Sequence, residues 1–101
     1  MDKEEIIKIL KEISVLLELK DENPFKIRAY QNSARSLEAS DIDFGKDLKI
    51  GDLTKIKGIG QHIAERIKEL FDTGGLKFYE DLKKTVPPGL VEMLEIGRAH
   101  V

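Results

Sequence analysis

The sequence predicts an all-α protein, a compact bundle of short helices. Apolar residues recur at spacings of three and four in several segments, and no segment alternates apolar and polar residues as a half-buried strand does. Pairs of helix-breaking residues, Gly74-Gly75 and Pro87-Pro88, separate some of these segments. A chain of 101 residues suffices for one domain with a modest core, and we place that domain at residues 1–96.

The first half of the chain contains two clear helical patterns. Ile6, Leu10, Ile13 and Leu17 form an apolar stripe, which predicts an amphipathic helix from about Lys3 to Leu19. Asn23 followed by Pro24 is typical of an N-cap and first helical residue, and the second helix is expected to run to about Ala39. Mixed Asp, Gly and Lys residues then predict a loop over Ser40–Gly51.

The second half predicts shorter helices. Asp52 is expected to cap a very short helix through Lys55. Apolar spacing after Gly60 predicts a helix that ends at Gly74-Gly75, and a further helix from about Leu76 is stopped by Pro87-Pro88. Residues 90–96 allow a last short helix. The remaining residues, 97–101, lack periodicity and are interpreted as a frayed terminus or an artificial tail.

Composition narrows the function. There is no cysteine, which excludes disulfides, thiolate metal sites and thiol nucleophiles. No apolar run approaches the roughly 20 residues needed to span a bilayer, and the charged N-terminus does not resemble a signal peptide. We therefore expect a cytoplasmic monomer without a membrane partner. The net charge is −2, but residues 24–36 hold three basic side chains and no acid, which permits a basic face.

Ile56-Lys57-Gly58-Ile59-Gly60 is the most informative motif, because a helix follows it directly. The two glycines allow a sharp turn and close approach of a partner to the backbone. The start of a helix adds unpaired N–H groups and the positive end of a dipole. Such a site suits a phosphate oxygen. Residues 52–71 resemble a helix-hairpin-helix DNA-binding motif, which binds the DNA backbone independently of base sequence. A plain helical corner is the alternative.

A broader resemblance covers Leu16 to Ile96. The segments Asn23–Arg35, Ile63–Leu70 and Thr73–Leu76 are similar in order and spacing to the N-terminal domain of family X DNA polymerases. The resemblance implies a non-catalytic domain that binds gapped or nicked DNA at the 5′-phosphate side, as part of a longer repair polymerase that acts in base excision repair. The polymerase's own catalytic domain is not within these residues.

The resemblance also implies residue roles. Lys26 and Tyr30 fall where the family binds the terminal 5′-phosphate, and Phe25 falls where a ring stacks on a template base, a contact worth about 1–3 kcal/mol. Core packing is the alternative role for both rings. The remaining DNA-binding candidates belong to the hairpin and the helix after it: Lys55, Lys57, Gly58, Ile59, Gly60, His62 and Arg66.

The resemblance implies one possible ligand besides DNA, a monovalent cation such as sodium or potassium. The backbone carbonyls of Thr54, Ile56 and Ile59 correspond to those that hold it in this family. Carbonyl oxygens are suitable ligands for a hard cation, and no other cofactor is expected.

Some family members are also lyases, whose reaction proceeds by way of an imine formed by a lysine side chain. The matching position here is Arg66, whose guanidinium stays protonated and forms no imine. His62 replaces a phosphate-binding lysine, and Phe25 replaces a polar group. Lys68 is the only substitute nucleophile that we consider, and the alternative is that Lys68 is an ordinary solvated surface lysine.

Besides a DNA-binding domain and a lyase, the sequence allows a third hypothesis, a helical protein-interaction module, which is based on the acidic first helix.

Overall fold

The computed structural model describes residues 1–87 and residue 89, and these residues form five helices and no strand. The helices are α1 (Lys3–Leu19), α2 (Pro24–Ala39), α3 (Ile50–Thr54), α4 (Gln61–Thr73) and α5 (Lys77–Lys84). This confirms the predicted all-α class. The expected helix at 90–96 and the terminus at 97–101 lie outside the described residues. None of the described helices has the length and apolar character needed to cross a membrane.

Local capping explains where the first two helices begin. The Asp2 carboxylate accepts the N–H of Glu5 at 2.8 Å, and the Asn23 side chain accepts the N–H of Phe25 at 2.9 Å. Both bonds satisfy donors that the first turn of a helix leaves unpaired. Pro24 follows Asn23 at the first helical position, where no N–H is needed. The predicted bounds of α1 and α2 are therefore confirmed.

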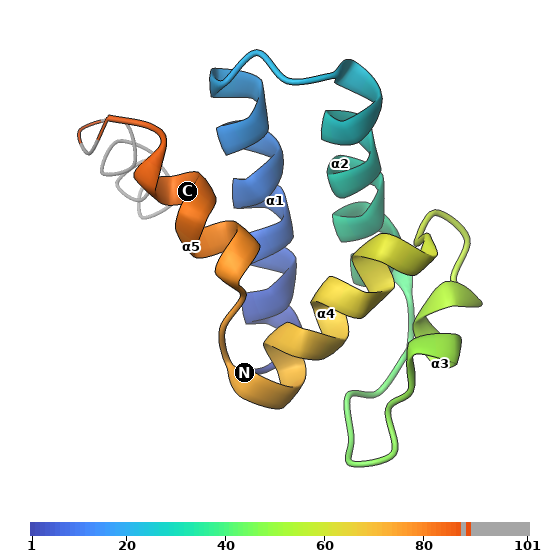
Figure 1. The fold of residues 1–101 in the computed structure, drawn as a ribbon. Coiled ribbons are helices and arrows are strands. Elements are labelled where there is room, and N and C mark those ends of the chain that lie inside the picture. The colour runs from blue at the N-terminus through green and yellow to red at the C-terminus, as the bar shows by residue number, and fades with distance from the viewer. Residues whose placement is uncertain (88, 90–101) are drawn as a thin grey trace.

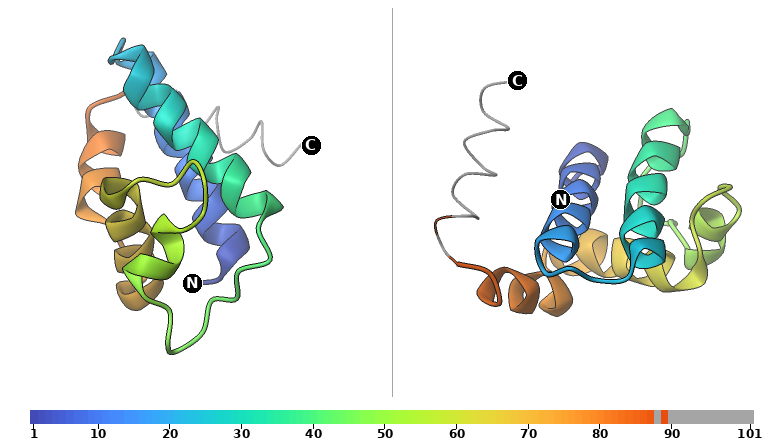
Figure 2. Two further views of the ribbon diagram at one scale, coloured as in Figure 1. Left: turned by 90° about the vertical axis from the view of Figure 1, so that its right-hand side faces the viewer. Right: turned by 90° about the horizontal axis from the view of Figure 1, so that it is seen from above.

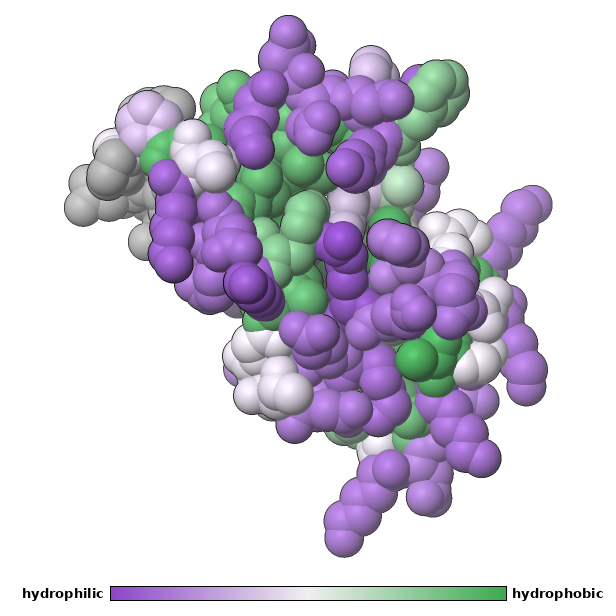
Figure 3. Space-filling model, viewed as in Figure 1, coloured by the Kyte–Doolittle hydropathy of each residue, from purple (hydrophilic) through white to green (hydrophobic). Residues whose placement is uncertain are grey.

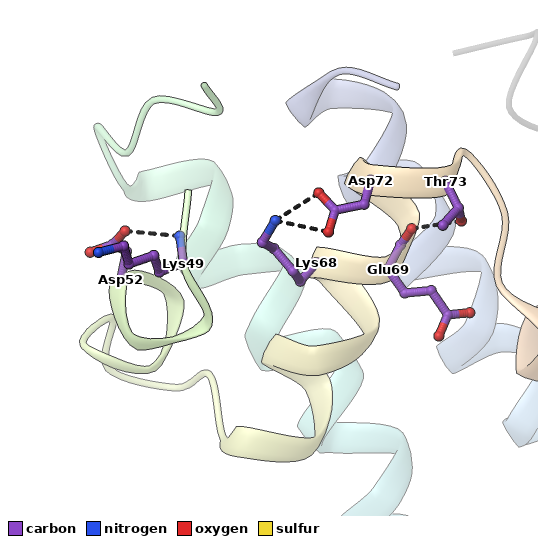
Figure 4. A network of polar contacts seen from close by, with 6 residues as sticks. All are labelled: Lys49, Asp52, Lys68, Glu69, Asp72 and Thr73. Carbon is purple, nitrogen blue, oxygen red and sulfur yellow. Dashed lines mark hydrogen bonds and ion pairs between the residues drawn. The ribbon is translucent and has the colours of Figure 1, made fainter. Parts of the chain in front are cut away.

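The prediction for α3 was wrong at its start. The helix begins at Ile50, with Lys49 as its N-cap residue, so the expected loop ends two residues earlier than Gly51. Asp52 is the third helical residue instead of the cap. Its carboxylate accepts the backbone N–H of Lys49 at 3.0 Å (Figure 4). The acid still satisfies a donor at this helix end, but from inside the first turn.

Three of the helices pack around α1. Helices α1 and α2 run antiparallel side by side, α4 crosses beneath them, and α5 lies on the opposite side of α1 from α2 (Figures 1 and 2). Their apolar stripes meet in one core. Its members with at most 1% of their surface exposed are Ile6, Leu10, Ile13, Leu16, Leu17, Ala34, Leu37, Leu53, Ala64, Ile67 and Leu70.

A buried polar contact joins α5 to α1. Tyr79 donates a hydrogen bond from its hydroxyl to the Glu12 carboxylate, and both residues are buried.

Charged and polar residues cover most of the face over α3 and α4, whereas apolar residues are visible between the upper parts of α1 and α2 (Figure 3). The helices therefore place the segment between α3 and α4 on a hydrophilic face.

Candidate nucleic-acid interface

The hairpin between α3 and α4 turns at Gly58, whose φ is +101°. This backbone conformation is strained for any residue with a Cβ atom. A Cβ at this position would also collide with the Ser36 hydroxyl of α2. The fold itself thus favours glycine at residue 58, through its positive φ and through its close approach to α2.

Gly60 differs from Gly58 in both respects. It is the N-cap residue of α4 with φ −83° and ψ 172°, which any residue adopts. A Cβ at Gly60 would meet no atom of the described residues within 4 Å. The fold therefore has no steric need for this glycine. Open space in front of a helix N-terminus is what close approach of an external group requires.

The N-terminus of α4 leaves several donors without a protein partner. Among the described residues, the backbone N–H groups from Gly60 to Ile63 donate to no acceptor, and the first N–H to do so is that of Ala64, which bonds Gly60 O at 2.9 Å. No side chain in the described part of the chain caps this helix. The unpaired groups and the positive end of the helix dipole thus face the open space at Gly60.

Basic side chains surround the hairpin on its exposed surface. Lys55 and Lys57 belong to it and are exposed, as is His62 in the first turn of α4. Ile59, by contrast, is 4% exposed and anchors the hairpin in the core. Only the backbone of Ile59 is therefore offered to a ligand.

The three carbonyls predicted to hold a cation retain free lone pairs. The Ile56 oxygen accepts one hydrogen bond, from the N–H of Ile59 at 3.1 Å. Among the described residues, no donor bonds the carbonyl oxygens of Thr54 and Ile59. A carbonyl oxygen has two lone pairs, so each of the three has at least one for a cation. Carbonyl oxygens are ligands of the kind that a hard monovalent cation prefers.

Helix α2 presents an exposed aromatic ring beside basic residues. Phe25 is 75% exposed, and the Arg28 guanidinium lies 5.1 Å from its ring centroid. The core-packing alternative for Phe25 is therefore not what the structure shows. Lys26 is exposed and lies 3.9 Å from the Glu22 carboxylate, a distance at which the pair interacts weakly. Both Phe25 and Lys26 are accessible to a ligand.

Tyr30 is part of the core, in contrast with Phe25. Its ring is 4% exposed and stacks on Phe78 of α5, with ring centroids 6.1 Å apart and ring planes 12° apart. Burial raises the pKa of the Tyr30 hydroxyl, and the Arg66 guanidinium, which shares a hydrogen bond with it, opposes that rise. The hydroxyl thus remains protonated at neutral pH beside a positive charge.

Arg66 lies within this aromatic cluster. Its guanidinium carbon is 3.7 Å from the centroid of the Phe78 ring, and its buried Nη1 has no hydrogen-bond partner among the described residues. Phe78 and Tyr30 therefore contact the side chain that the family resemblance matches to the lysine of the lyases. The sequence pattern did not reveal Phe78 as part of this cluster, because an aromatic residue on an apolar helical stripe is indistinguishable from ordinary core.

Lys68 is engaged by a carboxylate. Its ammonium donates to both Asp72 oxygens, at 2.7 and 2.8 Å (Figure 4). An imine-forming lysine must instead present an uncharged amine. Lys68 therefore forms a surface ion pair with a residue one helical turn away, as expected for an ordinary surface lysine and not for a nucleophile.

Comparison with known proteins identifies the domain. A family model described as a helix-hairpin-helix domain matches residues 1–76. The chain is also 38% identical over 96 residues to the DNA polymerase/3′-5′ exonuclease PolX of Bacillus subtilis (strain 168). That match covers 95% of this chain and 16% of the relative, so the chain spans only a small part of the relative's length. The predicted resemblance to family X polymerases is confirmed, and the chain belongs to the helix-hairpin-helix domain family.

Proposed function

We propose that this chain is a DNA-binding domain of a family X DNA polymerase and that it binds the DNA backbone without reading base sequence. The observation that carries the proposal is the run of unpaired N–H groups from Gly60 to Ile63 at an open helix N-terminus. Such groups bind phosphate oxygens, and phosphate contacts position a protein on DNA without specifying its sequence.

The preferred DNA in this proposal is a gap or nick with a 5′-phosphate. Lys26 supplies an exposed charge near the start of α2, and the exposed Phe25 ring supplies a stacking surface for an unpaired base. Tyr30 contributes through its hydroxyl beside Arg66, because its ring is committed to the core. A monovalent cation on the carbonyls of Thr54, Ile56 and Ile59 would add positive charge next to the phosphate.

The proposed function is DNA binding and does not include the lyase reaction. Arg66 forms no imine, and the Lys68 ammonium is bound to Asp72. The domain would act within a longer repair polymerase.

The first test is a titration of gapped DNA, with a 5′-phosphate or a 5′-hydroxyl, at several salt concentrations. Affinity should fall with salt by a log–log slope of about −0.7 to −0.9 per phosphate neutralised, and the phosphorylated gap should bind more tightly. Equal affinity for the two gaps would contradict the roles of Lys26 and Tyr30. An absence of DNA binding would contradict the whole proposal.

The second test separates DNA binding from folding at Gly60. Asparagine is a better N-cap residue than glycine, so Gly60→Asn should stabilise the protein by a few tenths of a kcal/mol. The same side chain would occupy the space and the N–H groups that a phosphate needs, so DNA affinity should fall about tenfold or more.

Gly75→Asn is the matched control, because a Cβ at Gly75 also meets open space and lies outside the hairpin. It should leave DNA affinity unchanged. If Gly60→Asn binds DNA as tightly as the wild type, the hairpin is not the phosphate site.

A further inference from the structure

We infer that Ser33 is a positioning residue that couples the hairpin to α2 and so sets the separation of two phosphate-binding elements. The inference rests on the proposed function. The hairpin amides form the first element, and the exposed N-terminal half of α2, with Lys26, forms the second. Ser33 itself touches no DNA, because its side chain is fully buried.

The geometry at Ser33 joins two segments that are far apart in the chain. Its Oγ lies 2.7 Å from the carbonyl oxygen of Ala29, in the same helix, and 3.2 Å from that of Gly58, in the hairpin. A serine hydroxyl has one hydrogen that rotates to suit its acceptors. Both carbonyls are within its reach, so one hydroxyl connects the backbone of α2 to the turn of the hairpin.

The contact surface around this bond is narrow and consists of α2 residues. The Cβ position of Gly58 faces the Ser36 hydroxyl, and the carbonyl oxygen of Asn32 lies 3.8 Å from it. Since Gly58 contributes no side chain, this residue meets α2 through its backbone atoms alone. A small displacement of the turn would therefore shift the amides of Gly60–Ile63 relative to Lys26.

A second buried serine shows what the hydroxyl does without such a bridge. Ser14 in α1 is 3% exposed, and within the described part of the chain its Oγ bonds only the Lys11 carbonyl of its own helix, at 2.6 Å. Bonds of this type from a helical serine to an earlier carbonyl are common. The bond to Gly58 is what distinguishes Ser33, and it connects the two elements that the proposed function assigns to phosphate.

The test measures a selectivity ratio, the affinity for a gap with a 5′-phosphate divided by the affinity for the same gap with a 5′-hydroxyl. Loss of stability lowers the folded fraction equally for both DNAs and leaves this ratio unchanged. Misplacement of α2 relative to the hairpin lowers the ratio, because the terminal phosphate and the backbone phosphates are no longer bound together. The two gaps also distinguish a terminal phosphate from an internal one.

Ser33→Ala should lower the ratio about threefold to tenfold, the range that corresponds to one net hydrogen bond. Ser33→Cys keeps nearly the same volume with a much weaker donor, and it should lower the ratio similarly. Ser14→Ala is the matched control and should leave the ratio at its wild-type value. Circular dichroism confirms that each variant is folded.

An unchanged ratio in Ser33→Ala would overturn the inference while leaving the proposed function intact. A wild-type ratio in Ser33→Cys would overturn it as well, because volume alone would then account for the role of Ser33. A wild-type chain that binds no DNA would instead contradict the proposed function itself.

Discussion

The Arg66 guanidinium lies 3.7 Å from the centroid of the Phe78 ring, and the same ring stacks on Tyr30. The stack brings together α4 and α5, which are consecutive in the chain, and α2, which is separated from them by α3. Guanidinium–aromatic contacts of this kind gain strength when they are desolvated. Arg66, which the family resemblance matches to the lysine of the lyases, is thus part of the packing between three helices.

This stack predicts opposite effects for two phenylalanines. Phe78→Leu should destabilise the protein by about 2 kcal/mol, because it removes both a cation–π contact and an aromatic pair. Phe25→Leu should change stability by less than about 0.5 kcal/mol, since the ring is largely exposed, but it should weaken binding to gapped DNA. Urea unfolding and DNA titration measure the two effects. Equal destabilisation by both substitutions would contradict the assignment.

Gly58 and Ser36 predict a coupled pair of substitutions. Gly58→Ala should destabilise the protein by about 2 kcal/mol or more, through a strained positive φ and a collision with the Ser36 hydroxyl. Ser36→Ala in the same chain removes the colliding oxygen and should recover part of that loss. A double-mutant cycle by urea unfolding measures the coupling. Strict additivity would show that the collision has no energetic effect.

The pKa of Tyr30 predicts how stability changes at alkaline pH. Burial raises that pKa above its ordinary value of 10.0, so the folded state holds the proton more tightly than the unfolded chain. The corresponding stability is fully present below pH 10 and is lost as the pH rises through the folded pKa. Urea unfolding between pH 8 and 11 should show a smaller loss for Tyr30→Phe than for the wild type. An identical loss would contradict the prediction.

Lys68 predicts a negative result in a trapping experiment. Because its ammonium is bound to Asp72, incubation with abasic DNA and borohydride should yield no covalent adduct that depends on Lys68. Lys68→Ala should also cost only about 0.3–0.5 kcal/mol, as expected for an exposed ion pair at this spacing. An adduct that disappears in Lys68→Ala would show that the domain has lyase activity.

The hairpin carbonyls predict a dependence on the identity of the cation. Potassium and tetramethylammonium chloride at the same concentration screen charge alike, but the larger ion cannot be coordinated by carbonyl oxygens. DNA affinity should be lower in tetramethylammonium. Gly60→Asn is the informative comparison, because a variant with an impaired hairpin should lose this difference. Equal wild-type affinity in both salts would contradict a bound cation.

Local features of the chain were sufficient to predict most helix bounds. Asn23 with Pro24 and the left-handed Gly74 are signals that act within one turn of the backbone. The position predicted for Asp52 was wrong because a local signal can fit more than one place in a helix start. An acid near a helix start is equally consistent with the N-cap and with the third helical position, since both satisfy N-terminal donors.

The sequence by itself determined the all-α class and the glycine turn that opens α4, because periodicity and glycine placement are local properties. Only the tertiary structure decided which side chains meet. Ser33 bonds Gly58 across 25 positions, and Tyr79 bonds Glu12 across 67. Such contacts depend on the angle and register at which helices pack, and an apolar stripe specifies a buried face without specifying its partner.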